Sequence, residues 1–403
     1  MPHGNAFTLS SNIVRLVSVS LGHFANDFYM NLVPPILFVF ADNMSLSLTE
    51  QGFLAFIITS SGSFAQPLIG HLCDKKGKPQ FLVYSLVWIA FWMSITGHIS
   101  NYYLLVVILG IGALASALYH PLGSAVTIRL INKAQGTSLS IFMAIGDFAA
   151  SFAPLVVIPL VNNYGLQSLI YLLVPGLIVA LFMYLTHLNK IEFNIGECSD
   201  EVQGKAEVKI NMYTAKWLSI LLFISTIRYW ITRVFLVFGV QFLLLKDVNL
   251  TIAGIVLSLY LFAKTLGIFL GGIITDIIGS KNIMVISYLV SILCVGLMVL
   301  CSGLATIILF IVMGFAISTS STANIVIAHQ IVPKNATFAT GLIMGFAGGL
   351  GGLGILLLGK LADMFGLLNA VTYLLVPLII TCIITSFLPA TAGKKRLFKG
   401  VST

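Results

Sequence analysis

Continuous apolar runs alternate with short polar loops along almost the whole chain. Each run has about 20 residues or more, which is the length a helix needs to cross a bilayer, and none shows the alternation of a transmembrane strand. The sequence therefore predicts an all-α membrane protein with twelve transmembrane helices. Their approximate ranges are 12–40, 48–72, 79–98, 102–130, 136–162, 166–188, 214–245, 250–274, 281–301, 304–330, 336–361 and 367–389.

One long polar stretch interrupts this pattern between the sixth and seventh helices. It contains acidic residues, lysines and few large apolar side chains, which is typical of a linker. We expect an N-terminal six-helix bundle at 1–188, a cytoplasmic linker at 189–215, and a C-terminal six-helix bundle with a basic cytoplasmic tail at 216–403.

Composition excludes a soluble protein, because 58% of the 403 residues are hydrophobic and only 8% are charged. Most of the 21 Lys and Arg residues fall on one predicted side, which the positive-inside rule assigns to the cytoplasm. Both termini are therefore expected there, in a multi-pass protein of the cytoplasmic (inner) membrane. The net charge of +8 reflects this topology, so no nucleic-acid partner is predicted.

Neither the cysteines nor the glycine-rich motif indicates a cofactor. The five cysteines form no Cys-x-x-Cys pair, so we expect free thiols without a metal site. Gly349, Gly351 and Gly354 fit a dinucleotide fingerprint by spacing, but they lie inside an apolar run with no preceding strand. They are interpreted as a helix-packing stripe, and no enzymatic activity is predicted. The start of the chain shows no cleavable signal peptide, because its first apolar stretch is too long.

A hydrophilic island from Gly70 to Pro79 separates the second and third predicted helices, and its outline returns in the second half. The repeat keeps a constant offset of about half the chain, which indicates two similar halves. The residues of the island and of its copy are Gly70, Asp74, Lys75, Gly77, Lys78, Gly272, Asp276 and Gly279.

The island resembles the signature loop of the major facilitator superfamily. Shorter runs at Leu21–Asp27, Tyr119–Gly123 and Thr340–Gly354 resemble the fosmidomycin resistance branch of that family. The resemblance implies two six-helix bundles around a central cavity that open alternately to either side. It also implies a conformational latch formed by the island, in which Asp74 meets the start of the eleventh helix near Ala336. An ordinary topology-setting role remains the alternative for Lys75.

Ionisable residues at membrane depth are the sharpest functional signal, because burying a charge in hydrocarbon is costly. Asp27 lies near the middle of the first predicted helix, and His23 lies one turn earlier on the same face. A carboxylate in a closed cavity takes up protons readily, and an approaching cation drives them off again. Proton coupling is therefore predicted for Asp27, His23 and Asp147. Purely structural hydrogen bonding is the alternative for each of them.

Substrate binding is predicted for a second set of membrane-depth residues. The bases Arg228, Arg233 and Lys264 outnumber the acids Asp27 and Asp147 by one, and this excess positive charge favours an anionic or zwitterionic substrate. An arginine can hold a carboxylate or phosphonate by two parallel hydrogen bonds. The alternatives are that Arg228 only bridges to Asp27 or Asp147, and that His120 is a packing donor beside Pro121. The predicted substrate-binding residues are Arg228, Arg233, Lys264, His120, Asn26 and Tyr229.

Two positions depart from the family pattern. The fourth helix has Val106 where many proton-coupled members have an arginine. The antiporter signature of the fifth helix has an adjacent Gly-Pro pair, whereas here Gly146 and Pro154 are separated. The resemblance still implies proton-coupled efflux of a small molecule by a monomer in the bilayer. Proton-coupled uptake of a small organic anion is the first alternative. A non-transporting receptor is the second, although no large extramembrane domain is present, and a channel is disfavoured because no polar ring repeats.

Overall fold

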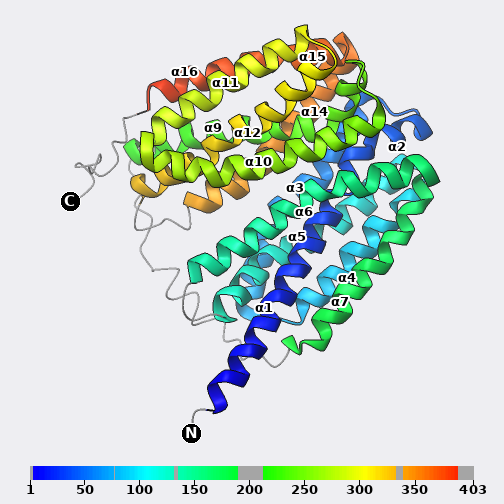
Figure 1. Ribbon diagram of the computed structural model, residues 1–403, viewed down its shortest axis with the longest axis vertical. Helices are drawn as coiled ribbons and strands as arrows, with labels where there is room; N and C mark the ends of the chain where they lie inside the picture. Colours follow the sequence, from blue (N-terminus) through cyan, green and yellow to red (C-terminus); the bar gives the residue numbers. More distant parts are fainter. Residues whose placement is uncertain (1–2, 77, 131–134, 189–211, 333–338, 389–403) are drawn as a thin grey trace. The chain divides into compact units, whose positions relative to one another are not determined.

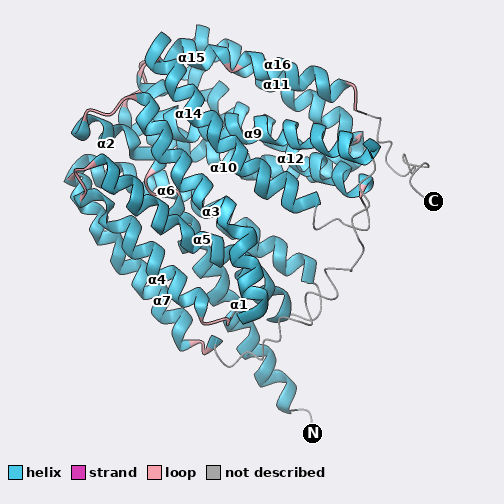
Figure 2. Cartoon of the chain, turned by 180° about the vertical axis from the view of Figure 1, so that it is seen from behind, coloured by secondary structure: helices cyan, strands magenta, loops and turns pink. Residues whose placement is uncertain are grey.

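The computed structural model describes residues 3–76, 78–130, 135–188, 212–332 and 339–388. Over these ranges the chain forms helices joined by turns and contains no strand (Figure 2). The prediction of an all-α protein is therefore confirmed.

The chain divides into two compact units. Unit 1 comprises Met1–Met44 and Ile57–Glu201. Its complete helices, shown in blue to green in Figure 1, are α1 (His3–Met30), α2 (Leu37–Met44), α4 (Phe81–Ser94), α5 (Tyr102–Leu130), α6 (Gln135–Tyr164) and α7 (Leu173–Leu185), with 3-10 turns η1 (Pro34–Ile36), η2 (Ile95–His98) and η3 (Leu166–Leu172).

Unit 2 comprises Ser45–Phe56 and Val202–Thr403. Helix α3 (Leu48–Lys76) begins in unit 2 and continues into unit 1. The predicted boundaries at 188 and 216 remain predictions, because residues 189–211 lie outside the described part. The other helices of unit 2 are α9 (Met212–Leu244), α10 (Leu250–Ile278), α11 (Ser280–Leu300), α12 (Leu304–Ile331), the π-helix η6 (Gly341–Phe346), α14 (Ala347–Phe365), α15 (Leu367–Tyr373) and α16 (Leu375–Ser386).

Eleven segments among the described residues are long and apolar enough to cross a membrane. The remaining long helix is α3, with 29 residues, some of whose side chains lie outside the described residues. The eleven segments and α3 correspond one to one with the twelve predicted helices. The fold class is therefore as predicted.

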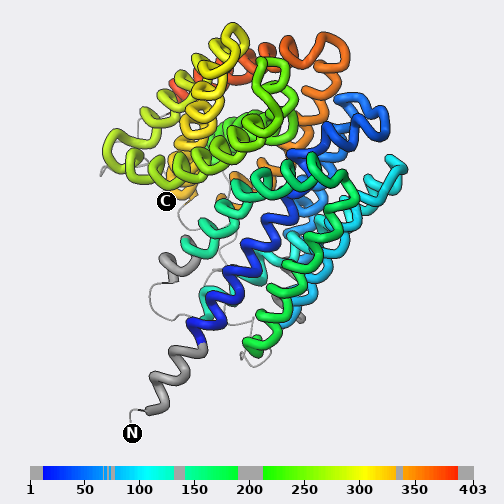
Figure 3. The backbone as a smooth tube through the Cα atoms, turned by 45° about the vertical axis from the view of Figure 1, so that its right-hand side comes forward, coloured from blue at the N-terminus to red at the C-terminus, as the bar shows by residue number. Residues whose placement is uncertain are grey.

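The first and second predicted helices differ in detail from the structure. The first was predicted as one helix over 12–40, but α1 ends at Met30 and the chain turns before α2 (Figure 3). Pro34 and Pro35 explain this break, because proline cannot donate the backbone hydrogen bond of a continuing helix. The second helix was predicted to end at residue 72, whereas α3 runs to Lys76, so most of the island continues the helix.

A doubly capped N-terminus fixes the start of α3 within unit 2. Ser47 and Glu50 form a capping box, with the Glu50 carboxylate accepting from the Ser47 backbone N–H at 2.9 Å. The carboxylate of Asp363, at the end of α14, accepts hydrogen bonds from the backbone N–H groups of Leu48 and Thr49, each at 2.8 Å. These bonds satisfy donors that the first helical turn leaves without partners.

Glycines let α14 lie directly against α9 in unit 2. A Cβ atom at Gly351 would come within 2.6 Å of the Tyr229 Cβ, and one at Gly354 would meet the ring of Trp230. A side chain at either position would push the helices apart. Close packing is therefore confirmed for Gly351 and Gly354, which press on the helix that carries Arg228 and Arg233.

Candidate functional site

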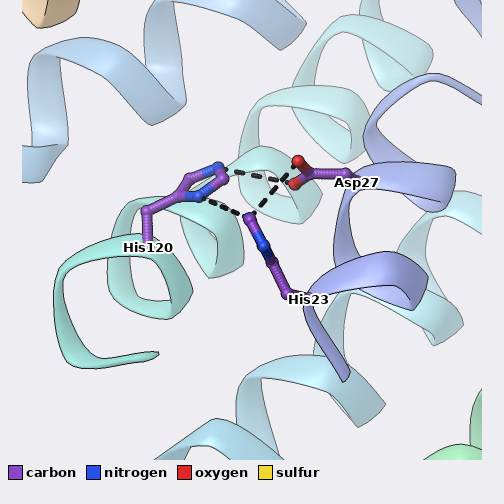
Figure 4. Close-up of side chains that lie close together, drawn as sticks. All are labelled: His23, Asp27 and His120. Atoms are coloured by element: carbon purple, nitrogen blue, oxygen red, sulfur yellow. Dashed lines mark hydrogen bonds and ion pairs between the residues drawn. The ribbon is translucent and has the colours of Figure 1, made fainter. Parts of the chain in front are cut away.

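Three ionisable side chains meet inside unit 1, from α1 and α5 (Figure 4). The Asp27 carboxylate lies between two imidazoles, with Oδ2 3.4 Å from the His23 Nε2 and Oδ1 3.5 Å from the His120 Nε2. The His23 Nε2 is also 3.1 Å from the His120 Nδ1. We call His23, Asp27 and His120 the His–Asp–His cluster. The sequence placed His23 beside Asp27 but assigned His120 to the substrate, so this convergence is a finding of the structure.

His23 is held rigidly. Its Nδ1 lies 2.7 Å from the backbone oxygen of Phe142 in α6. Because a carbonyl oxygen only accepts hydrogen bonds, the Nδ1 carries a proton, and the Nε2 points into the cluster. The ring stacks on Phe142 at a centroid distance of 4.0 Å and faces Tyr119 at 6.1 Å. His23 is 1% exposed, so the position of its ring is set by the surrounding helices.

Asp27 receives further support from neighbouring amides. Asn26 is fully buried and its Nδ2 donates to Asp27 Oδ1 at 2.9 Å and approaches the Ser116 Oγ at 3.3 Å. Asn31 donates to the Asp27 backbone oxygen at 2.8 Å, where α1 ends. Asn26, predicted to bind substrate, therefore orients the carboxylate in this structure.

Helix α6 closes the cluster from a third side. Gly146 brings the α6 backbone against it, and a Cβ at this position would lie 2.5 Å from Asp27 Oδ2 and 2.8 Å from His23 Nε2. The next residue, Asp147, interacts electrostatically with His120. Asp147 is half-buried, and its predicted role in proton coupling remains a prediction.

Replacing Gly146 by alanine is expected to disrupt the cluster. The added methyl group overlaps the Asp27 and His23 side chains, and overpacking of this kind costs about 1–3 kcal/mol. The unfolding temperature of the purified protein should fall, and concentrative transport should be lost. Gly296→Ala is the matched control, because nothing lies within 4 Å of the added Cβ. Alanine in a helix is up to about 1 kcal/mol more stable than glycine, so this variant should not lose stability. Equal behaviour of the two variants would contradict the close approach of α6.

A second polar group lies in unit 2, on α9. Arg228 is only 5% exposed, and its guanidinium lies over the ring of Tyr229 at 4.2 Å. Arg233 lies 5.7 Å from the same ring. The Nε and Nη2 of Arg228 are buried without a hydrogen-bond partner among the described residues. The structure therefore brings together three of the residues predicted to bind substrate.

The sequence comparisons agree on one family. The model of the Major Facilitator Superfamily matches residues 19–245 and 218–403. The chain belongs to the major facilitator superfamily. It is thus a multi-pass membrane transporter that binds a small-molecule substrate, and not an enzyme.

Relatives in this superfamily include two curated bacterial proteins. The chain is 25% identical over 367 residues to the fosmidomycin resistance protein of Escherichia coli (strain K12), covering 86% of both chains. It is 26% identical over 370 residues to the uncharacterized MFS-type transporter YfnC of Bacillus subtilis (strain 168), covering 87% of both. The predicted resemblance to the superfamily and to the fosmidomycin resistance branch is confirmed.

Solved structures share the fold. A mutant form of the nucleoside transporter NupG matches with a TM-score of 0.77 and 16% sequence identity, covering 92% of this chain and 98% of that chain. A bacterial homologue of the human lysosomal transporter Spinster, in an inward-facing and unoccupied conformation, matches with a TM-score of 0.75 and 15% identity, covering 93% and 96%. At these identities the likeness concerns the fold alone.

The island predicted to form the superfamily latch is only partly described. The α3 backbone continues through Gly70, Asp74 and Lys75, but the side chains of Asp74 and Lys75 lie outside the described part. Gly77 and Ala336 lie outside the described residues altogether. Lys78 is exposed, and the contact of Asp74 with the eleventh helix remains a prediction.

The copy of the island lies at the end of α10. Gly272 faces α12, where an added Cβ would lie 3.3 Å from the Thr322 Cγ2, and Asp276 is exposed in the last helical turn. Gly279 has a φ of +88°, which side chains rarely adopt, so it ends α10 and permits α11 to begin at once.

Lys264 lies on α10 and is half-buried. Its contacts are internal to the protein, and its place in a substrate site remains a prediction. The sequence did not indicate the Phe142 backbone oxygen, Tyr119 or Gly146 as parts of the His–Asp–His cluster. A backbone carbonyl carries no sequence signal, but the position of Gly146 directly before a membrane-depth aspartate could have suggested a close helix approach.

Proposed function

We propose that this transporter exports a small anionic compound from the cytoplasm in exchange for protons, by alternating access of its two halves. The observation that carries this proposal is the buried guanidinium of Arg228, whose Nε and Nη2 have no hydrogen-bond partner among the described residues. A buried polar group of this kind is costly unless something pairs with it. A substrate anion is the partner that a transporter supplies.

The two unpaired atoms define the chemistry of that substrate. Nε and Nη2 share one edge of the planar guanidinium, and their parallel N–H bonds match two oxygens of a carboxylate, phosphate or phosphonate. The face of the same group is covered by Tyr229, and Arg233 adds a second positive charge 5.7 Å from the centre of that ring. An anion bound to the edge would therefore meet two positive charges on a rigid support. Lipophilic cations should be rejected.

The His–Asp–His cluster supports the coupling to protons. A proton between the Asp27 carboxylate and the His23 Nε2 would turn two facing acceptors, 3.4 Å apart, into a hydrogen-bonded pair. His120, Asp147 and Tyr119 are the other ionisable groups around this carboxylate. Asp27 is in this proposal the residue that is protonated and deprotonated in each cycle, with His23 fixing its geometry.

The direction and the location are part of the same proposal. The relative in Escherichia coli is named for resistance to fosmidomycin, and resistance is a natural outcome of export. The excess of Lys and Arg on one predicted side supports a cytoplasmic membrane location with both termini in the cytoplasm. We further propose that the monomer is the transporting unit, since one chain carries both units.

Charge preference is the property that tests this proposal. Purified protein in liposomes should exchange a labelled anionic compound, and a panel of unlabelled anionic, zwitterionic and lipophilic cationic compounds should be used as competitors. We expect phosphonates and carboxylates to compete and cations to be without effect. Competition by lipophilic cations that matches or exceeds that of the anions would overturn the assignment of Arg228 to the substrate.

A further inference from the structure

The three side chains of the His–Asp–His cluster present nitrogen and oxygen atoms to one common point (Figure 4). One such atom from each residue can be chosen so that all lie within 4.8 Å of one another. We propose that His23, Asp27 and His120 form a binding site for a divalent transition-metal cation of the Zn²⁺ or Co²⁺ type. This site goes beyond the proposed export function and does not depend on it. The sequence predicted no metal site, because that prediction considered the cysteines alone.

The distances within the cluster fit a tetrahedral ion. Zn²⁺ binds imidazole nitrogen and carboxylate oxygen at about 2.0–2.2 Å, which places neighbouring ligand atoms of a tetrahedron roughly 3.3–3.5 Å apart. The observed separations are 3.4 Å from His23 Nε2 to Asp27 Oδ2, 3.5 Å from His120 Nε2 to Asp27 Oδ1, and 3.1 Å between the histidines. These separations involve both oxygens of Asp27 and both ring nitrogens of His120. To bind one ion with one atom from each residue, His120 would rotate until a single ring nitrogen faces the ion.

The cluster is also oriented as a metal site requires. Histidines that bind a metal usually donate their other ring N–H to a carbonyl or carboxylate, and His23 donates its Nδ1–H to the Phe142 oxygen at 2.7 Å. The ligating carboxylate is itself hydrogen-bonded, through Asn26 Nδ2 at 2.9 Å. Both supporting contacts leave His23 Nε2 and Asp27 Oδ2 facing each other, 3.4 Å apart, where one cation can contact both atoms.

A metal ion satisfies the cluster more completely than a single proton. One proton joins one pair of atoms, whereas one divalent ion contacts all three side chains together. Asp27 lies in the last turn of α1, where the helix dipole also favours a cation. Two imidazoles with one carboxylate select zinc, cobalt or nickel over magnesium or calcium, which prefer oxygen ligands.

The site is accessible and incomplete. The side chains of Asp27 and His120 are 18% and 29% exposed, so an ion can enter and a fourth ligand can come from water. Three protein ligands with water in the fourth position is a common arrangement in zinc sites. Because the ligands come from α1 and α5, a bound ion would link these two helices and stabilise unit 1.

Metal binding to the purified full chain, free of any histidine tag and treated with a chelator, tests the proposal. Titration with Co²⁺ should give the visible absorption of a tetrahedral complex at one ion per chain, and Zn²⁺ should displace it and raise the unfolding temperature. His120→Ala and Asp27→Asn should each weaken binding by at least about tenfold. His98→Ala is the matched control, because His98 is exposed in η2, and it should bind Co²⁺ as the wild type does.

Two results would overturn the proposal. One is the absence of stoichiometric Co²⁺ or Zn²⁺ binding in the wild type at micromolar concentrations. The other is binding whose affinity and spectrum are the same in His120→Ala, Asp27→Asn and the wild type, since the ion would then lie elsewhere. The readouts are spectroscopic and thermal, so they are independent of whether the protein exports an anion.

Discussion

Replacing Arg228 by alanine or methionine should abolish transport of anionic compounds and weaken their binding about 100-fold. Removing one partner of a buried, hydrogen-bonded charge pair costs about 2–5 kcal/mol, and 1.4 kcal/mol corresponds to a factor of ten. Arg228→Lys should retain part of the binding, because it keeps the charge but loses the bidentate edge. Competition binding with the labelled anion, followed in detergent, gives these affinities directly.

The same substitution separates a substrate site from a structural bridge. The Nε and Nη2 of Arg228 are buried without hydrogen-bond partners among the described residues, so Arg228→Met, measured without added substrate, should unfold at a higher temperature than the wild type. A structural ion pair would give the opposite result, a clear loss of stability. Arg15→Met is the matched control, because the Nε of Arg15 donates to the Thr186 backbone oxygen at 3.2 Å and its loss should destabilise. A destabilised Arg228→Met that still binds anions would refute the assignment.

Asp27→Asn should uncouple transport from the pH gradient. The amide keeps the shape of the carboxylate and the contact with Asn26, but it cannot gain and lose a proton in the cycle. We expect concentrative transport driven by a pH gradient to disappear, while exchange of labelled for unlabelled substrate across the liposome membrane continues. Measuring both activities on the same liposomes distinguishes uncoupling from a general loss of function.

Asp247→Asn provides the matched control for this substitution. Asp247 is exposed, follows α9 and has a φ of +62°, a conformation that asparagine adopts as readily as aspartate. Its concentrative transport should equal that of the wild type. Full accumulation by Asp27→Asn under an imposed pH gradient would show that the coupling residue lies elsewhere, with Asp147 as the next candidate.

The fold could be predicted from the sequence because the membrane imposes a strong rule. Apolar runs must form helices to satisfy their backbone hydrogen bonds, and the predicted range 102–130 matches α5 to the residue. The predicted ends of the first and second helices were wrong because individual residues, and not the length of the apolar run, decide where a helix stops. Pro34 and Pro35 interrupt the first span, and the island residues up to Lys76 continue α3.

The candidate site could be predicted in part. The spacing of His23 and Asp27, four residues apart on one helix, was sufficient to place them together. The contact with His120 depends on how α1 and α5 pack, and the anchoring of His23 depends on a backbone oxygen of α6. Neither is encoded in a local pattern, so the sequence could not distinguish a histidine of this cluster from one that binds substrate. The stacking of Arg228 and Arg233 on Tyr229 likewise required the structure.

Substrate accumulation in inverted membrane vesicles, under pH gradients of either sign and with the membrane potential clamped, tests the central claim most directly. The lumen of such vesicles corresponds to the outside of the cell. Exchange of a cytoplasmic anion for external protons predicts accumulation when the lumen is acidic, and none when the lumen is alkaline. Accumulation only with an alkaline lumen would show proton symport into the cell, and accumulation that ignores the gradient would show that protons are not the coupling ion.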